Sequence, residues 1–167
     1  MKQQVNGSVA INKNHTASGA VGQPGTDLRA RHHPTCFVCS PVSVGGLGLT
    51  FHAAPDDALM CEHTFEPKLE GYSGIVHGGI LAAALDGAMT NWLLVHGHPA
   101  VTAELKVRFR HPVSTGLPVT LRARLVEHAP PIFVMAAEAF QYGQRVVTAT
   151  AKFVENASSA RITEAQP

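Results

Sequence analysis

The sequence predicts an α+β domain in which a curved antiparallel sheet lies against one long helix. Three observations support this fold class: an apolar helix is expected over residues 80–95, two short strand-like runs precede it, and four longer runs follow it. Successive strands joined by short turns favour antiparallel pairing. A helix that is apolar around most of its circumference needs cover over a wide arc, which a sheet curling around it provides.

The elements are expected in a simple order. Residues 1–30 are polar and glycine-rich without a hydrophobic period, so we expect a flexible tail there and another over residues 156–167. The domain between them, residues 31–155, begins with an irregular loop. Strands are expected at residues 47–51, 59–65, 101–110, 119–127, 132–141 and 145–155, with a glycine-rich loop over residues 66–79 before the helix.

Composition excludes several classes of protein. The chain has 167 residues, of which 45% are hydrophobic and 15% charged, and its formal net charge is +1. This length fits one domain with a real core, and this charge argues against binding nucleic acid through its phosphates. We find no secretory signal, and the apolar tract 80–95 is too short and too polar to span a membrane. Three cysteines fit a reducing compartment, so we expect a cytoplasmic protein.

Side-chain patterns assign faces to the helix and to the first strand after it. An apolar stripe recurs at gaps of three and four residues and is expected to face the core: Leu81, Leu85, Ala88, Trp92 and Val95. Strict alternation over residues 104–110 predicts a half-buried strand. Its inward side chains are Leu105, Val107 and Phe109, and its outward ones are Lys106, Arg108 and Arg110.

The start of the helix carries the pattern with the clearest chemical meaning. Gly78 and Gly79 allow close backbone approach, and first-turn N–H groups have no partner inside the helix. Such a site suits charge that develops on a carbonyl oxygen during acyl transfer. Asp86 follows in apolar surroundings on a second stripe with Gly79, Ala83 and Thr90. A carboxylate there needs a partner or a task, and a bond to a neighbouring strand remains an equal alternative to a functional role.

These residues resemble a known family. His77-Gly78-Gly79 with an acid nine positions after the histidine is similar to the hotdog-fold acyl-CoA thioesterases of the phenylacetyl-CoA thioesterase-like branch. The similarity covers about residues 33–155. It includes the segments 36–39 (CFVC), 46–51 (GLGLTF), 99–102 (PAVT) and 109–112 (FRHP).

The resemblance implies a hotdog fold, with the sheet wrapped around the central helix, and a homodimer or dimer of dimers with active sites between subunits. In such a site the Gly78 N–H would polarise the thioester carbonyl and His77 would shape the loop. Asp86 of the other subunit would act as general base or nucleophile, and Thr102 would orient the attacking water. The expected reaction is hydrolysis of an acyl-CoA to free CoA and a carboxylic acid, with no cofactor and no metal.

One position departs from the family pattern. Relatives often carry Asn or Gln six residues before the histidine, where this chain has Gly71. Either Glu70, Tyr72 or Ser73 compensates in substrate binding, or catalysis is weak. A CoA- or acyl-binding protein without catalytic activity therefore remains an alternative, and a hydratase or dehydratase a lesser one. The acyl group itself is not readable from the sequence.

Basic and cysteine residues each have two interpretations. Lys106, Arg108 and Arg110 could bind CoA phosphates, joined by Arg122 and Arg124 if their strands pair, or they could form an ordinary solvated face. The Cys36/Cys39 pair near two histidines could suggest zinc. Because no second such pair exists, we interpret these cysteines as small, partly buried hydrophobic residues.

Overall fold

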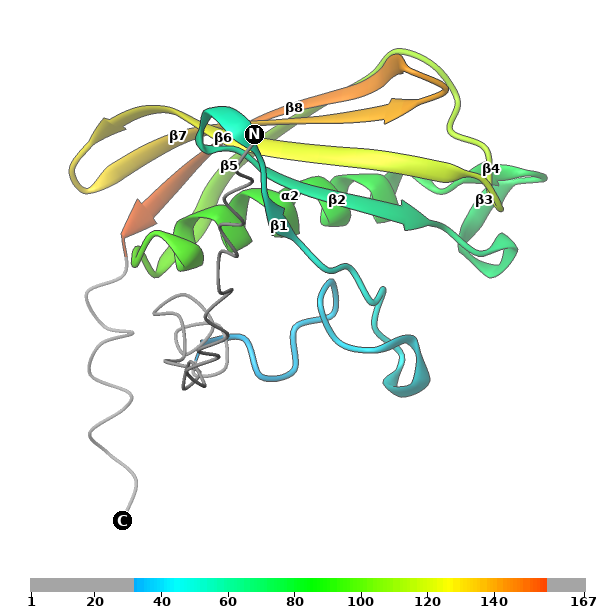
Figure 1. Cartoon of the computed structure of the whole chain (residues 1–167), viewed down its shortest axis with the longest axis horizontal. Coiled ribbons are helices and arrows are strands. Elements are labelled where there is room, and N and C mark those ends of the chain that lie inside the picture. Colours follow the sequence, from blue (N-terminus) through cyan, green and yellow to red (C-terminus); the bar gives the residue numbers. More distant parts are fainter. Residues whose placement is uncertain (1–31, 156–167) are drawn as a thin grey trace, which may run out of the picture.

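A single long helix, α2 (Gly78–Val95), lies beneath the concave face of a six-stranded sheet in the computed structural model (Figure 1). The structure describes residues 32–155, so the predicted tails at 1–30 and 156–167 lie outside the described residues. All strand pairs are antiparallel, in the order β1-β2-β6-β7-β8-β5. The strands are β1 (His52–Ala53), β2 (Leu59–Thr64), β5 (Ala100–Phe109), β6 (Pro118–Ala129), β7 (Ile132–Gln141) and β8 (Gln144–Glu155). The predicted α+β class and the sheet around a central helix are confirmed.

Small side chains on the inner face of the sheet let the helix approach closely. One cross-sheet row runs from Val107 through Ala149, Ala137 and Ala123 to Leu59. The large side chains of α2 fill the space above these alanines, including Leu85, Met89 and Leu93, all fully buried. Hydrophobic burial on this face is the main force that holds the helix in place.

The predicted core stripe of α2 is confirmed over most of its length. Leu81, Leu85, Ala88 and Trp92 are buried, whereas Val95 at the end is 48% exposed. The helix begins two residues earlier than predicted, at Gly78. It ends with Gly97 in the left-handed region, where the His98 N–H bonds the Leu93 carbonyl at 2.9 Å. By length and composition α2 would also be able to cross a membrane, but here it is packed as a core helix.

Two predictions about the first half of the domain are wrong. Residues 47–51 form no strand: they belong to a loop whose Leu47 and Leu49 are buried and whose N–H groups bond the carbonyls of residues 37 and 38. This loop lies on the side of α2 opposite the sheet (Figure 1). The strand-like pattern of residues 47–51 therefore comes from two leucines that pack into the core, although no strand pairs with them.

The glycine-rich segment before the helix is also more ordered than predicted. After the short 3-10 helices η1 (Val42–Val44), η2 (Pro55–Asp57) and η3 (Pro67–Leu69), a small hairpin forms from β3 (Glu70–Tyr72) and β4 (Ile75–Val76). Gly74 adopts a φ of 72° in its turn, and its N–H donates to the Glu70 carboxylate at 2.8 Å. The hairpin fixes the chain just ahead of α2.

Strand β5 forms one edge of the sheet and contains an irregularity. It pairs only with β8, and its register shifts between Thr102 and Glu104, which leaves Ala103 as an extra residue. Thr102 is thereby paired with Phe153, which is fully buried on the inner face. Simple alternation from Leu105 would have turned Thr102 to the outer face, so the bulge turns its hydroxyl towards the helix.

Candidate active site

A helix start leaves four N–H groups without helical partners, and three of them are bonded here: those of Gly79 and Ile80 to His77, and that of His77 itself to the Leu69 carbonyl at 2.9 Å. The His77 Nδ1 accepts from the Gly79 N–H at 2.9 Å, and the His77 carbonyl accepts from the Ile80 N–H at 3.0 Å. Within residues 32–155, nothing accepts from the fourth, the Gly78 N–H. Because buried or half-buried N–H groups are nearly always bonded, this donor is available to a ligand.

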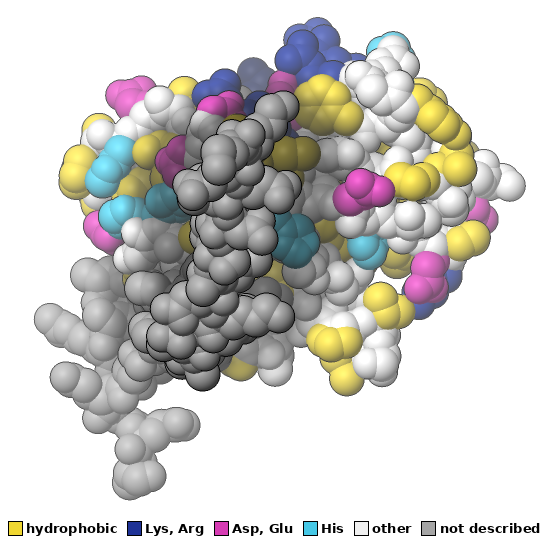
Figure 2. Space-filling model, viewed as in Figure 1, with side chains coloured by type: hydrophobic (Ala, Val, Ile, Leu, Met, Phe, Trp, Pro, Cys, Tyr) yellow, Lys and Arg dark blue, Asp and Glu magenta, His cyan; other side chains and the backbone are white. Residues whose placement is uncertain are grey.

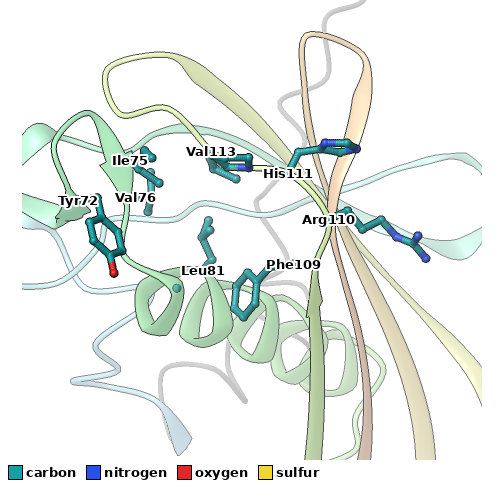
Figure 3. Close-up of a pocket in the computed structure, with 10 residues that line it drawn as sticks. Tyr72, Ile75, Val76, Leu81, Phe109, Arg110, His111 and Val113 are labelled. Carbon is teal, nitrogen blue, oxygen red and sulfur yellow. The ribbon is translucent and has the colours of Figure 1, made fainter.

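A pocket of about 390 Å³ opens beside Gly78 (Figure 3). Its walls are mainly apolar: Leu81, Val76 and Val113 are buried, while Tyr72 and Phe109 stand on either side of the first helical turn. A Cβ at Gly78 would lie 3.3 Å from the Phe109 ring, so glycine is what allows this close packing. Arg110 and His111 lie on the pocket's other side, with Arg110 pointing away from it in Figure 3.

Asp86 is half-buried and bonded to a strand. The Thr102 hydroxyl donates to the Asp86 carboxylate at 2.8 Å, across from β5 to α2. Burial raises the pKa of Asp86 above its ordinary value, while the Thr102 bond and the nearby His33 oppose that rise. The result is a carboxylate that is more basic than usual but keeps one fixed hydrogen bond. The hydrogen bond to a neighbouring strand, which was the predicted alternative to a functional role, is therefore present. Thr102 bonds only one of the two carboxylate oxygens of Asp86.

The helix stripe that contains Asp86 is exposed at Gly79 and buried at Thr90. Gly79 is exposed and Ala83 is half-buried, so the N-terminal part of the stripe is accessible to solvent. Thr90 is only 8% exposed, and its hydroxyl donates to the Asp86 carbonyl at 3.0 Å. Thr90 therefore supports the helix at this point and does not line the open part of the stripe.

Glu70, Tyr72 and Ser73 were the predicted replacements for a polar side chain at position 71, and their surroundings differ. The Glu70 carboxylate is used in the β3–β4 turn. Tyr72 is 81% exposed at the pocket, and Ser73 is exposed in the turn. A Cβ at Gly71 would lie 3.0 Å from His77 Cδ2, so a larger residue there would press on the imidazole ring.

The two polar features of α2 cannot act on one carbonyl from the same chain. Asp86 lies eight residues after Gly78, which at 1.5 Å per residue is about 12 Å along the helix axis. The Gly78 N–H also points away from Asp86, since helical N–H groups face the N-terminus. A base and a carbonyl-binding amide must be within a few ångströms of the same substrate atom, so the Asp86 carboxylate and the Gly78 N–H of one copy cannot serve the same carbonyl.

The basic residues divide into two groups on the outer face of the sheet. Lys106, Arg108 and Arg110 follow one another at the edge strand. Arg122 and Arg124 lie on β6, with β7 and β8 between them and β5, so the conditional pairing of these two strands is wrong. Arg122 is moreover bonded to Asp56. Figure 2 shows Lys and Arg side chains gathered along the sheet side of the molecule.

Sequence reasoning missed most of the pocket wall. Leu81, Val76 and Val113 look like ordinary core residues, and Phe109 was assigned to the core because of its alternation. The available signal in the sequence was that Phe109 is the last inward-facing residue of its strand and directly precedes the segment Arg110-His111-Pro112. Cys36, Cys39 and Cys61 form no disulfide, and residues 32–155 contain no cluster of three or more potential metal ligands.

The chain's sequence also matches a known family. Residues 73–148 fit the family described as the Thioesterase superfamily. The chain has a hotdog fold, and residues 73–148 are similar to the Thioesterase superfamily. The resemblance inferred from His77-Gly78-Gly79 and Asp86 is thereby confirmed.

Solved hotdog structures align over most of the chain. A thioesterase superfamily protein matches with 26% identity and a TM-score of 0.67, over 74% of this chain and 63% of its own. A candidate thioesterase of Ralstonia eutropha, described as related to phenylacetic acid degradation, matches with 25% identity and a TM-score of 0.62, over 75% of this chain and 96% of its own. A mutant of the phenylacetic acid degradation protein PaaI from Thermus thermophilus matches with 25% identity and a TM-score of 0.60, over 66% and 95%.

One curated protein is similar to the chain at the sequence level. It is described as a candidate esterase of Saccharolobus solfataricus, with 29% identity over 96 residues, or 56% of this chain and 63% of the relative. The match therefore spans less than two thirds of that relative's length.

Proposed function

We propose that this hotdog protein hydrolyses acyl-CoA thioesters to free CoA and a carboxylic acid, at a site shared between two copies of the chain. The observation that carries the proposal is the pair of half-sites on α2. One is the free Gly78 N–H beside an apolar pocket, and the other is the half-buried Asp86 held by Thr102. Their separation of about 12 Å along one helix is bridged only when a second copy brings its own α2 alongside.

The surface that would receive the second copy is open. Strand β5 is a ten-residue edge with Val101 54% exposed, and the neighbouring helix stripe of Gly79 and Ala83 is accessible. A long apolar edge strand offers unpaired N–H and C=O groups to another strand. Edge-to-edge pairing would continue the sheet and set the two helices side by side, as a homodimer or a unit of a larger dimer of dimers.

In this site the thioester carbonyl would accept a hydrogen bond from the Gly78 N–H. Asp86 of the second copy would take a proton from water, whose oxygen then attacks the carbonyl carbon. The tetrahedral intermediate expels the CoA thiolate, which takes up the proton, and the C–S bond is replaced by C–O. Attack by the carboxylate itself, giving an anhydride that water then cleaves, is the alternative role of Asp86. Thr102 would fix the carboxylate in either case.

The remaining predicted contacts are assigned by position. The pocket walls with Tyr72, and the accessible helix stripe of Gly79 and Ala83, would contact the apolar parts of the substrate. Arg110, Arg108 and Lys106 alternate along one face of the edge strand from the pocket outwards, and would bind the CoA phosphates. Glu70, Ser73 and Thr90 would support this site through the chain segments they hold.

The decisive experiment combines two defective variants. Gly78→Pro removes the free N–H and adds ring atoms beside Phe109; the helix should still form, because proline suits the first helical position and His77 already has the extended ψ of 132° that proline requires. Gly78→Ala is its matched control, since it keeps the N–H and adds only a methyl group. Asp86→Asn removes the base. Each defective variant alone should lose about 10²-fold or more of kcat, measured with a panel of acyl-CoAs and a thiol reagent.

Mixing the two variants after unfolding and refolding tests the shared site. A mixed dimer contains one intact site, so a random mixture should recover about a quarter of wild-type activity. No recovery, despite mixed dimers seen by native mass spectrometry, would show that both groups act within one chain.

A CoA- or acyl-binding protein without turnover is the second candidate, favoured by Gly71 where a polar side chain is expected. It predicts that wild-type protein binds acyl-CoA by calorimetry but releases no thiol.

A further inference from the structure

We propose that Cys36 and Cys39 form a reversible redox site, whose two thiols close to an intramolecular disulfide by exchange with a small-molecule disulfide such as oxidised glutathione. The pair lies in the loop that covers α2 on the side away from the sheet (Figure 1). The structure describes its reduced form, since the two cysteines form no disulfide. This chemistry is separate from the candidate active site and does not depend on the hydrolysis of a thioester.

A tight turn brings the two cysteines together. The Cys36 carbonyl accepts from the Cys39 N–H at 3.1 Å and from the Ser40 N–H at 2.8 Å. A turn of this kind keeps its first and fourth Cα atoms within about 7 Å, and a disulfide usually joins Cα atoms about 4.4–6.8 Å apart. Both side chains are half-buried, so a small reagent can reach them. The thiols can therefore meet by rotation of their side chains, without a rearrangement of the loop.

Val38, which stands between the two cysteines, packs the turn on the helix. Its side chain is buried and lies against Gly87, where an added Cβ would be 2.5–2.9 Å from it. On the other side, the N–H groups of Leu47 and Leu49 bond carbonyls of the turn at 2.8 and 3.0 Å. Because the turn is held on both sides, the fold itself fixes the positions of the two thiols.

Asn91 of α2 binds the reduced form of the pair. Its side chain is buried, and Nδ2 donates to Cys39 Sγ at 3.2 Å and to the Gly87 carbonyl at 2.7 Å. Closing the disulfide would turn the Cys39 sulfur towards Cys36 and away from this amide, so the contact belongs to the reduced form. A buried donor that loses a partner costs free energy. Asn91 therefore opposes oxidation and gives the helix a part in setting the redox equilibrium.

The third cysteine of the chain, Cys61, has no part in the exchange. It lies on β2 and is 1% exposed, and burial raises the pKa of its thiol above the ordinary value. Cys39 adds to that rise, so the two side chains are neighbours. Because exchange requires a thiolate that the reagent can reach, we expect Cys61 to remain reduced. Its position next to Cys39 makes it the control that the experiment needs.

The reaction balances in two exchanges. One cysteine thiolate attacks glutathione disulfide, whose S–S bond breaks to give a protein–glutathione mixed disulfide and one glutathione thiolate. The thiolate of the other cysteine then attacks the protein sulfur of the mixed disulfide, forms the Cys36–Cys39 bond and expels the second glutathione. The pair loses two electrons and two protons, and glutathione disulfide is reduced to two thiols.

Equilibration of the full chain in glutathione buffers of varied ratio tests the site. As the oxidised share rises, the folded protein should lose two alkylatable thiols together, and dithiothreitol should restore both. Cleavage before Asp56 separates Cys61 from the pair, so mass spectrometry should find the disulfide within the fragment that holds Cys36 and Cys39. Thiols that stay reduced in excess oxidised glutathione, a stable glutathione adduct in place of the disulfide, or a bond to Cys61 would each overturn the proposal.

Two cysteine variants check which thiols react. Cys36→Ser should form only a glutathione adduct, whereas Cys61→Ala should be oxidised as the wild type is. Loss of the disulfide in Cys61→Ala would assign the bond to the wrong pair and overturn the proposal. The wild-type measurement decides the question even where a variant fails to fold.

A substitution in α2 tests whether the fold sets the equilibrium. Asn91→Ala removes the donor to Cys39 Sγ, so the equilibrium constant for disulfide formation should rise about fivefold. Trp92→Phe is the matched control, because it removes a bond from the same helix to a different loop, that to the Asp57 carbonyl at 2.6 Å, and should leave the constant unchanged. No change in Asn91→Ala, or an equal change in both variants, would contradict the role of Asn91.

Discussion

At the scale of single residues, Asp86 is where stability and reactivity oppose each other. Burial among apolar helix residues disfavours its charged form and raises its pKa, and the Thr102 hydroxyl and the nearby His33 compensate only in part. A carboxyl whose folded pKa lies above its unfolded pKa lowers stability as pH rises through the interval between them. The carboxylate therefore makes the domain less stable at neutral pH than an uncharged group of the same shape would.

Asp86→Asn should consequently be at least as stable as wild type at pH 7, although it loses about 10²-fold or more in hydrolysis. The amide oxygen can still accept from Thr102, so the bond to β5 survives. The stability difference should shrink as pH falls below the ordinary Asp value, because wild-type Asp86 is then protonated too. Thermal melts at pH 7 and pH 3 measure this, and a variant less stable than wild type at both would contradict it.

Thr102→Val should move the acidic limb of the kcat/KM profile to higher pH. The hydroxyl bond is the larger of the two effects that lower the Asp86 pKa, so its removal leaves only His33 to oppose burial and raises that pKa further. The activity loss should be largest at low pH. Thr102→Ser keeps the hydroxyl and is the control; an unchanged limb in the valine variant would mean that Asp86 is not the titrating base.

At the scale of elements, α2 is held between the sheet and the loop that contains Val38. A Cβ on Gly87 would lie 2.5–2.9 Å from the Val38 side chain, and Asn91 donates to the Gly87 carbonyl at 2.7 Å and to Cys39 Sγ at 3.2 Å. The loop thus packs directly on the backbone of the helix. This contact explains why a residue with poor helix propensity occupies the middle of the longest helix.

Gly87→Ala should therefore destabilise the domain by about 1–3 kcal/mol, through overpacking against a stiff valine. In an open helix position the same change would stabilise it by about 1 kcal/mol. The double variant Gly87→Ala/Val38→Ala should recover most of the loss, because it makes room for the new methyl group. Urea unfolding of the four proteins gives the coupling energy, and strict additivity would contradict direct contact.

At the scale of the whole molecule, charge on the outer sheet face is unevenly compensated. Several cations there have an acidic partner: Arg145 pairs with Glu138 and Lys152 with Glu104, both at 2.8 Å, and Arg122 pairs with Asp56. Lys106, Arg108 and Arg110 form no such ion pair within residues 32–155. They lie on the edge strand β5 or directly after it. This strand would form the proposed interface, and its C-terminal end lines the pocket.

Arg108→Ala should raise KM for acyl-CoA about tenfold at low salt with little change in kcat, and the effect should shrink as salt is added. Arg124→Ala is the matched control: it is also exposed on the outer face, but three strands away. An acyl-pantetheine, which lacks the nucleotide, should be hydrolysed equally by all three proteins. A KM increase for that substrate as well would assign Arg108 to folding or to the dimer.

The sequence by itself determined the helix, five of the six sheet strands and the residues at the helix start, because hydrophobic period and glycine position act locally. It also singled out Asp86 and Thr102. Only the tertiary structure decided that these two meet, since the extra residue Ala103 reverses the facing of Thr102 in a way that alternation alone does not predict. The pocket beside Gly78 was likewise hidden, because apolar residues that line a cavity and those that fill a core share the same pattern until chain segments distant in sequence are packed together.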